Sequence, residues 1–83
     1  MELEILTPKG LEFRDDVSRI TLPTKKGQIT VLSHHEPLIS VLEAGILTII
    51  TAAGESVSRE IEGGIMEVTD NKAEILLKKF WNV

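Results

Sequence analysis

The stretch from residue 27 to residue 50 reads GQITVLSHHEPLISVLEAGILTII. Its first part, residues 28–31, alternates polar and apolar side chains strictly, which is typical of a strand with one buried face. Two later runs, residues 38–42 and 46–50, carry apolar side chains on both faces of an extended strand. Short runs rich in Ile, Val and Thr, separated by turn residues such as Ala44-Gly45, predict β-strands. This stretch therefore indicates an all-β fold.

The rest of the chain repeats the pattern. Residues 2–5 and 72–75 also alternate strictly, and no window shows an apolar pattern at helical spacing. Turn signals recur between the runs, at Pro8-Lys9-Gly10, Lys25-Lys26-Gly27, Ala53-Gly54, Gly63-Gly64 and Asp70-Asn71. A chain of 83 residues allows one domain. We expect a single domain over residues 1–83, an antiparallel β-sandwich of two packed sheets built from short strands.

Composition excludes several classes of protein. The absence of cysteine removes disulfide frameworks, zinc fingers and thiol catalysis. Nine basic residues stand scattered against 13 acidic ones, for a net charge of −4, so a nucleic-acid partner is not expected. The apolar runs are too short to cross a bilayer, and the start Met-Glu-Leu-Glu lacks the features of a signal peptide. These features predict a soluble, intracellular protein.

The two doubly apolar runs leave two interpretations open. A strand of a two-layer sandwich normally has one face in water. A second apolar face indicates either a central strand under a covering loop or a surface that meets another protein. Because residues 38–42 and 46–50 follow each other and share the feature, the interface is favoured.

Side chains that could carry chemistry are few. His34, His35 and Glu36 form the one cluster of potential metal ligands, but neighbouring residues on an extended chain point in opposite directions. Ser33 beside His34 does not make a triad by adjacency, and Asp15-Asp16 is more typical of solvated acids. No catalytic residue, metal site or cofactor is predicted.

Two rival functions stay open on these residues. The lysines of Lys25-Lys26-Gly27, at an expected hairpin tip, would suit a carrier domain with a covalently modified lysine. A small metal-dependent enzyme would use His34 and His35. The pair Gly63-Gly64 lacks the spacing and the following lysine of a phosphate-binding loop.

A family resemblance rests on longer motifs. Residues 22–32, LPTKKGQITVL, followed by residues 33–40, SHHEPLIS, resemble the central signature of the epsilon subunit of the rotary F-type ATP synthase. Thr7-Pro8, Phe13, and residues 42–45 and 63–68 resemble the flanking parts of that family. The similarity covers nearly the whole chain and concerns the N-terminal β-sandwich domain of the subunit.

The resemblance implies a non-catalytic rotor subunit. It would join the gamma subunit to the polar loops of the c-ring, couple proton or sodium flow to ATP synthesis, and lie peripherally at the cytoplasmic face of a bacterial cell membrane, contacting the membrane only through the c-ring. Longer family members continue into a two-helix domain that inhibits hydrolysis. The sequence ends at Phe80-Trp81-Asn82-Val83 without such a pattern, as a natural short form or a trimmed chain, so no autoinhibition or ATP sensing is expected.

Matching positions then imply two sets of contact residues. The c-ring-facing turn corresponds to Lys25, Lys26, Gly27 and Gln28; the neutral Gln28 stands where many relatives carry an acid. The gamma-facing set corresponds to His35 and Ser40, with Thr7 beside them, and we expect Leu38 and Ile39 of the doubly apolar run at its centre.

Overall fold

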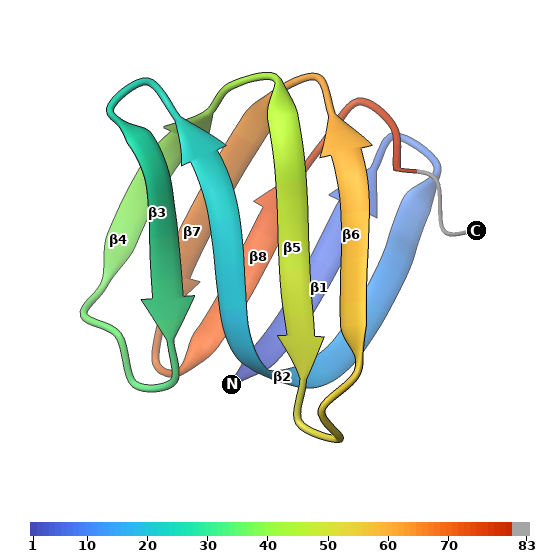
Figure 1. Ribbon diagram of the computed structural model, residues 1–83. Helices are drawn as coiled ribbons and strands as arrows, with labels where there is room; N and C mark the ends of the chain where they lie inside the picture. Colours follow the sequence, from blue (N-terminus) through green and yellow to red (C-terminus); the bar gives the residue numbers. More distant parts are fainter. Residues whose placement is uncertain (81–83) are drawn as a thin grey trace.

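The fold is seen in a computed structural model that describes residues 1–80; residues 81–83, and with them the end of the predicted domain, lie outside the described residues. The described chain is all strand, turn and loop (Figure 1). No segment of it forms a helix that could cross a membrane. The strands are β1 (Glu2–Thr7), β2 (Gly10–Thr24), β3 (Gly27–Leu32), β4 (Leu38–Leu42), β5 (Gly45–Thr51), β6 (Ser56–Ile61), β7 (Gly64–Thr69) and β8 (Lys72–Leu76).

Two layers face each other in Figure 1. The back layer runs in the order β1-β8-β7-β4, and the front layer contains β3, β5 and β6 around the second half of β2. The first half of β2 pairs with β1 and its second half pairs with β3 and β5, so one strand belongs to both layers. A single pairing, Thr24 opposite Leu42, joins β2 to β4 at the other side.

A bulge allows β2 to change layers. The register of the β2–β5 ladder shifts between Val17 and Arg19, and Val17 and Ile20 are both buried although they are three residues apart. An extra residue in one strand reverses which side chains point inward and increases the local twist. The chain therefore turns from the back layer into the front layer without a loop.

The core lies between the layers and is apolar. Side chains from alternate positions of both sheets fill it, with exposures of 0–1% for the largest group: Leu3, Ile5, Val17, Ile20, Leu22, Val31, Leu47, Ile49, Met66, Val68 and Ile75. Phe80 closes one end, its ring edge-to-face with Phe13 at a centroid distance of 6.3 Å. The domain measures 28 × 26 × 20 Å, and a close-packed apolar interior resists deformation.

The predicted all-β sandwich is confirmed, with three differences. The ladder between β1 and β8 is parallel, whereas the others formed by residues 1–80 are antiparallel. The strand β2 is 15 residues long and not short; Asp15 and Asp16, expected as solvated acids beside a turn, are exposed but lie inside this strand. Because β2 and β4 also pair, the two sheets are linked into one hydrogen-bonded system and are not separate.

Candidate interaction surfaces

The turn between β2 and β3 presents Lys25 and Lys26 to solvent. The Thr24 hydroxyl donates to the Gly27 carbonyl oxygen at 2.7 Å, and the Lys26 amide donates to Thr24 Oγ1 at 3.2 Å. Gly27 adopts φ +105°, a conformation that suits glycine. The backbone of the turn is thus held by hydrogen bonds while both lysines and Gln28 remain exposed, as the c-ring assignment requires.

Strand β4 shows which face of its doubly apolar run is free. Ile39 is 71% exposed and Val41 59% exposed, while Leu42 is buried and Leu38 packs against the core. Ser40 shares the inner face and is half-buried. No part of the described chain covers the outer face, so this run has one core face and one exposed apolar face. Ile39 is therefore the member of the predicted gamma set that points outward.

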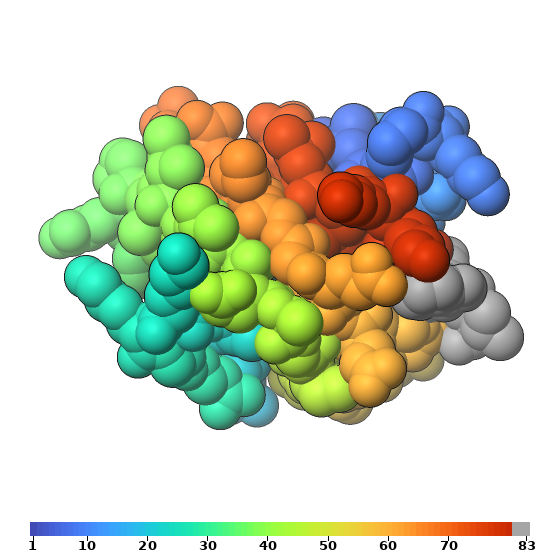
Figure 2. All heavy atoms as spheres, turned by 90° about the horizontal axis from the view of Figure 1, so that it is seen from above, coloured from blue at the N-terminus to red at the C-terminus, as the bar shows by residue number. Residues whose placement is uncertain are grey.

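Residues of the predicted c-ring set and of the predicted gamma set line one hollow. A hollow of about 360 Å³ lies between the β2–β3 hairpin and β4, at a corner of the end that Figure 2 shows. Its lining includes Lys25 and Lys26 from the hairpin and all of residues 38–41 from β4. The tip of the hairpin and the exposed apolar strand are thus neighbours.

The other two members of the gamma set lie apart from this hollow. Thr7 ends β1, at the opposite edge of the back layer, with β8 and β7 between β1 and β4. Its hydroxyl donates to Glu12 Oε1 at 3.1 Å and accepts from the Lys9 amide at 3.2 Å. His35 is exposed in the β3–β4 loop, at the other end of the sandwich from the β2–β3 turn (Figure 1). A partner touching all these positions must extend across the back layer.

The histidine loop is organised by backbone contacts. The His34 amide donates to Asn71 Oδ1 at 2.7 Å with His34 at φ +64°, and His35 Nδ1 lies 2.7 Å from the Glu36 carbonyl oxygen. In the described chain no three His, Asp or Glu side chains gather where they could hold a metal ion. These contacts tie the β3–β4 loop to the β7–β8 turn and give the loop a structural explanation.

The sequence did not reveal an apolar row on the outer face of the back layer. Register places Val41 opposite Ile65, Ile65 opposite Leu76, and Leu76 opposite Leu6. Ile65 is 46% and Leu76 52% exposed. Each of these residues looked like an ordinary strand position, because only the order and register of four strands set them side by side.

The Glu4 carboxylate, bound by two basic side chains, lies on the same outer face of the back layer. Glu4 is only 7% exposed, although it stands at a polar position of the alternating run at residues 2–5. Arg14 Nε donates to Glu4 Oε2 at 2.8 Å, and Lys72 Nζ lies 3.3 Å from Glu4 Oε1. The Arg14 hydrogen bond, with Lys72 adding to it, lowers the pKa of Glu4 against the opposing effect of burial. These contacts join β1 to β2 and β8.

These features define a small, rigid β-sandwich whose distinctive parts are exposed surfaces. Residues 1–82 match the family model described as ATP synthase, Delta/Epsilon chain, beta-sandwich domain, and the chain belongs to that family.

Comparisons with individual proteins agree. The chain is 39% identical over 77 residues to the ATP synthase epsilon chain of Sulfurovum sp. (strain NBC37-1), covering 93% of this chain and 60% of that protein. It is 42% identical over 74 residues to the epsilon chain of Pelotomaculum thermopropionicum, covering 89% and 54%. It thus spans between half and two thirds of the length of these relatives.

Solved structures show the same fold. A chain of the Euglena gracilis mitochondrial ATP synthase structure, titled OSCP/F1/c-ring, superimposes with a TM-score of 0.85 at 26% identity, over 93% of this chain and 49% of that one. A chain of the Tetrahymena thermophila mitochondrial ATP synthase structure, titled central stalk/c-ring, gives 0.82 at 27% identity, over 95% and 63%.

Proposed function

We propose that this chain is a non-catalytic rotor component of an F-type ATP synthase, held between the gamma subunit and the c-ring, at the cytoplasmic face of a bacterial membrane. One observation carries the proposal: a single rigid sandwich of this family presents an exposed basic turn at one end and an exposed apolar sheet face. Torque transmission requires two binding surfaces on a body that does not deform.

The apolar face suits the gamma contact. Interface energy concentrates in apolar side chains that lose contact with water, and polar groups form the rim. Ile39 and Val41 fit the centre of this contact, whereas Ser40 lies on the inner face of the same strand. The predicted assignment of Ile39 to the gamma contact therefore stays the best choice, with Leu38 supporting it from the core side.

The turn Lys25–Gln28 suits the c-ring contact because its side chains project into solvent from a fixed backbone. Exposed charge contacts are individually weak, about 0–1 kcal/mol, and partly screened by salt. The carrier-domain alternative would use the same exposed lysines, but family membership favours the stalk.

The test separates coupling from assembly. Changing Lys25 and Lys26 together to Glu should leave the melting temperature and gamma binding nearly unchanged, because the turn is exposed and its backbone bonds involve Thr24 and Gly27. In membrane vesicles carrying the variant, ATP hydrolysis should continue while ion pumping falls. The control is the double change to Arg, which keeps both charges.

The outcomes are distinct. Pumping lost by the Glu variant and kept by the Arg variant supports the c-ring assignment. Equal loss of hydrolysis and pumping would mean failed assembly, and full retention of both would mean that this turn does not face the ring. A mass increase on either lysine in protein isolated from cells would favour the carrier alternative.

A further inference from the structure

The outer face of the back layer carries two parallel rows of side chains. Val41, Ile65, Leu76 and Leu6 form the apolar row, and Leu11 of β2 lies opposite Leu6 at its end. One step along the strands, Glu67, Glu74, Glu4 and Arg14 form the charged row, and Ile39 of β4 stands opposite Glu67 at its end. The apolar row crosses the sheet from the strand that bears Ser40 to the strand that bears Thr7. It therefore spans the gap between the two edges of the predicted gamma set.

The charged row contains an unfavourable pair. Glu67 and Glu74 lie directly opposite each other on adjacent antiparallel strands, an arrangement that destabilises a sheet when both side chains are ionised. Within residues 1–80 neither carboxylate forms a hydrogen bond or a close ion pair. The nearby cations are mainly engaged elsewhere: Arg14 and Lys72 both bind Glu4, and Lys72 reaches Glu74 only by a weaker electrostatic attraction, which helps to raise the pKa of Lys72. The repulsion between the two carboxylates is thus only partly offset in the isolated domain, and a further cation lying over the pair would offset it more.

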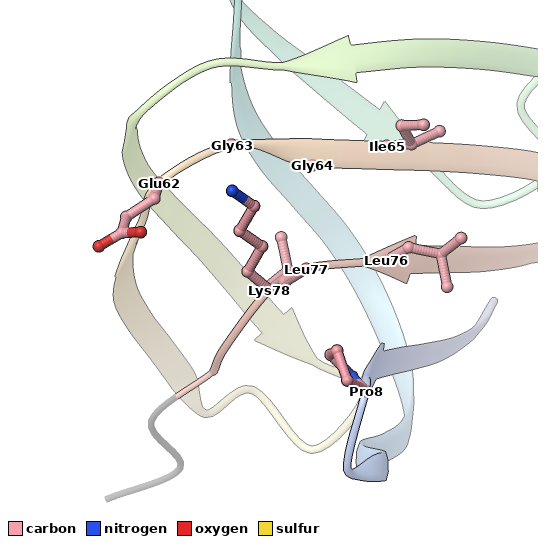
Figure 3. A pocket seen from close by; sticks show the side chains of 8 residues that line it. All are labelled: Pro8, Glu62, Gly63, Gly64, Ile65, Leu76, Leu77 and Lys78. Atoms are coloured by element: carbon pink, nitrogen blue, oxygen red, sulfur yellow. The ribbon is translucent and has the colours of Figure 1, made fainter.

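A hollow borders the apolar row. About 420 Å³ opens beside the row, lined by Pro8, the Glu62–Ile65 turn and the end of β8 (Figure 3). Figure 3 shows Ile65 and Leu76 on neighbouring strands at its rim, with Lys78 extending toward the Gly63-Gly64 backbone. The space is large enough for one apolar side chain of a partner to insert beside the row.

We propose that the Glu67–Glu74 pair and the apolar row form one recognition surface, which binds a segment of the gamma subunit that presents an apolar ridge flanked by a Lys or Arg. This inference rests on the proposed function and specifies the chemistry of the gamma contact. The basic side chain lies over the two carboxylates, and the ridge covers Val41, Ile65 and Leu76. The apolar row supplies most of the affinity, and the carboxylates set the orientation and the association rate.

Charge argues against a second copy of this chain as the occupant. The chain is acidic overall, and the cations that belong to this face are already bound to its own carboxylates. A second copy placed on the face would bring further glutamates toward Glu67 and Glu74. A partner that contributes an uncommitted cation removes the repulsion, whereas self-association adds to it.

The experiment measures binding of this chain to the purified gamma subunit of the same organism over a range of salt concentrations. Glu67→Gln/Glu74→Gln should weaken binding about tenfold at low salt and flatten its salt dependence. The same change should raise the melting temperature of the free chain by roughly 1–5 °C, because the cross-strand repulsion is removed. The matched control is Glu60→Gln, an exposed strand glutamate in the front layer, which should alter neither property.

A second variant tests the apolar row. Ile65→Ser should weaken gamma binding at least tenfold, and Ile46→Ser, at a similarly exposed isoleucine of the front layer, should not. Unchanged binding by both back-layer variants, with wild type bound, would overturn this surface while leaving the stalk function intact. Failure of the wild-type chain to bind gamma would instead remove the proposed function. Loss of self-association in Ile65→Ser without an effect on gamma binding would assign the face to a second copy and overturn the inference.

Discussion

Replacing Ile39 tests the gamma contact at the most exposed apolar side chain of the domain's back layer. Fully burying an isoleucine contributes about 1.5–3 kcal/mol, so covering the 71% of Ile39 that is exposed contributes about 1–2 kcal/mol. Since 1.4 kcal/mol is a factor of ten, Ile39→Ala should weaken gamma binding by roughly 5–30-fold. Ile39→Asp should weaken it further, because a charge is then desolvated opposite Glu67. Calorimetric titration with gamma gives the affinity, and circular dichroism gives the melting temperature.

The chain provides a closely matched control. Ile46 on β5 is 50% exposed and stands opposite Glu60, as Ile39 stands opposite Glu67. Both substitutions should therefore change the stability of the free domain by similar small amounts, within about 1 kcal/mol. Only the Ile39 variants should lose affinity. Equal effects of the Ile39 and Ile46 variants would refute the assignment of the gamma contact to the back layer.

Two further predictions concern the fold that carries these surfaces. Because the lowered pKa of Glu4 reflects its bond to Arg14, that contact stabilises the folded chain above the ordinary value of 4.5 and is lost as the pH falls through the lowered pKa. Glu4→Gln should thus lower the melting temperature at pH 7 and flatten its decline as the pH falls below the ordinary value of 4.5, which circular dichroism would follow. Gly64→Ala would place a Cβ onto the backbone oxygen of Leu76, at a cost of about 1–3 kcal/mol and a fall in melting temperature of roughly 5–20 °C. Gly54→Ala, with φ +92° and open space around it, should cost only about 1 kcal/mol, and equal melting temperatures for the two variants would contradict the steric argument.

The fold class could be predicted because its signals are local. Alternation at residues 28–31 and 72–75 and glycine at the corners specify strands and turns from neighbouring residues alone. The long β2 could not be predicted in the same way. Its inward-facing residues Val17 and Ile20 break the two-residue period at the bulge, so the sequence suggests two short runs where the chain forms one strand.

The same distinction between local signals and contacts of distant strands applies to the exposed surfaces. The exposed turn at Lys25-Lys26 and the free face of residues 38–42 followed from local composition, and the structure shows Lys25 and Ile39 exposed. The apolar row and the Glu67–Glu74 pair depend on strands that are distant in sequence, including a parallel ladder between the first and last strands. The burial of Glu4 is of the same kind, because alternation at residues 2–5 does not show that Arg14 and Lys72 bind its carboxylate.

The path of β2 gives a physical account of how a load on the Lys25–Gln28 turn could reach the back layer. The turn Lys25–Gln28 continues directly into β2, and β2 pairs with β3 and β5 in the front layer and with β1 in the back layer. A force applied at the turn is therefore carried along one covalent strand and its ladder hydrogen bonds, without passing through a flexible loop. The Arg14–Glu4–Lys72 contacts tie the first half of that strand across β1 to β8, beside the apolar row on the same face. In the proposed stalk function, the layer change of β2 joins the two surfaces into one rigid body. Weakening the Arg14–Glu4–Lys72 contacts should therefore lower coupling even where the β2–β3 hairpin remains intact.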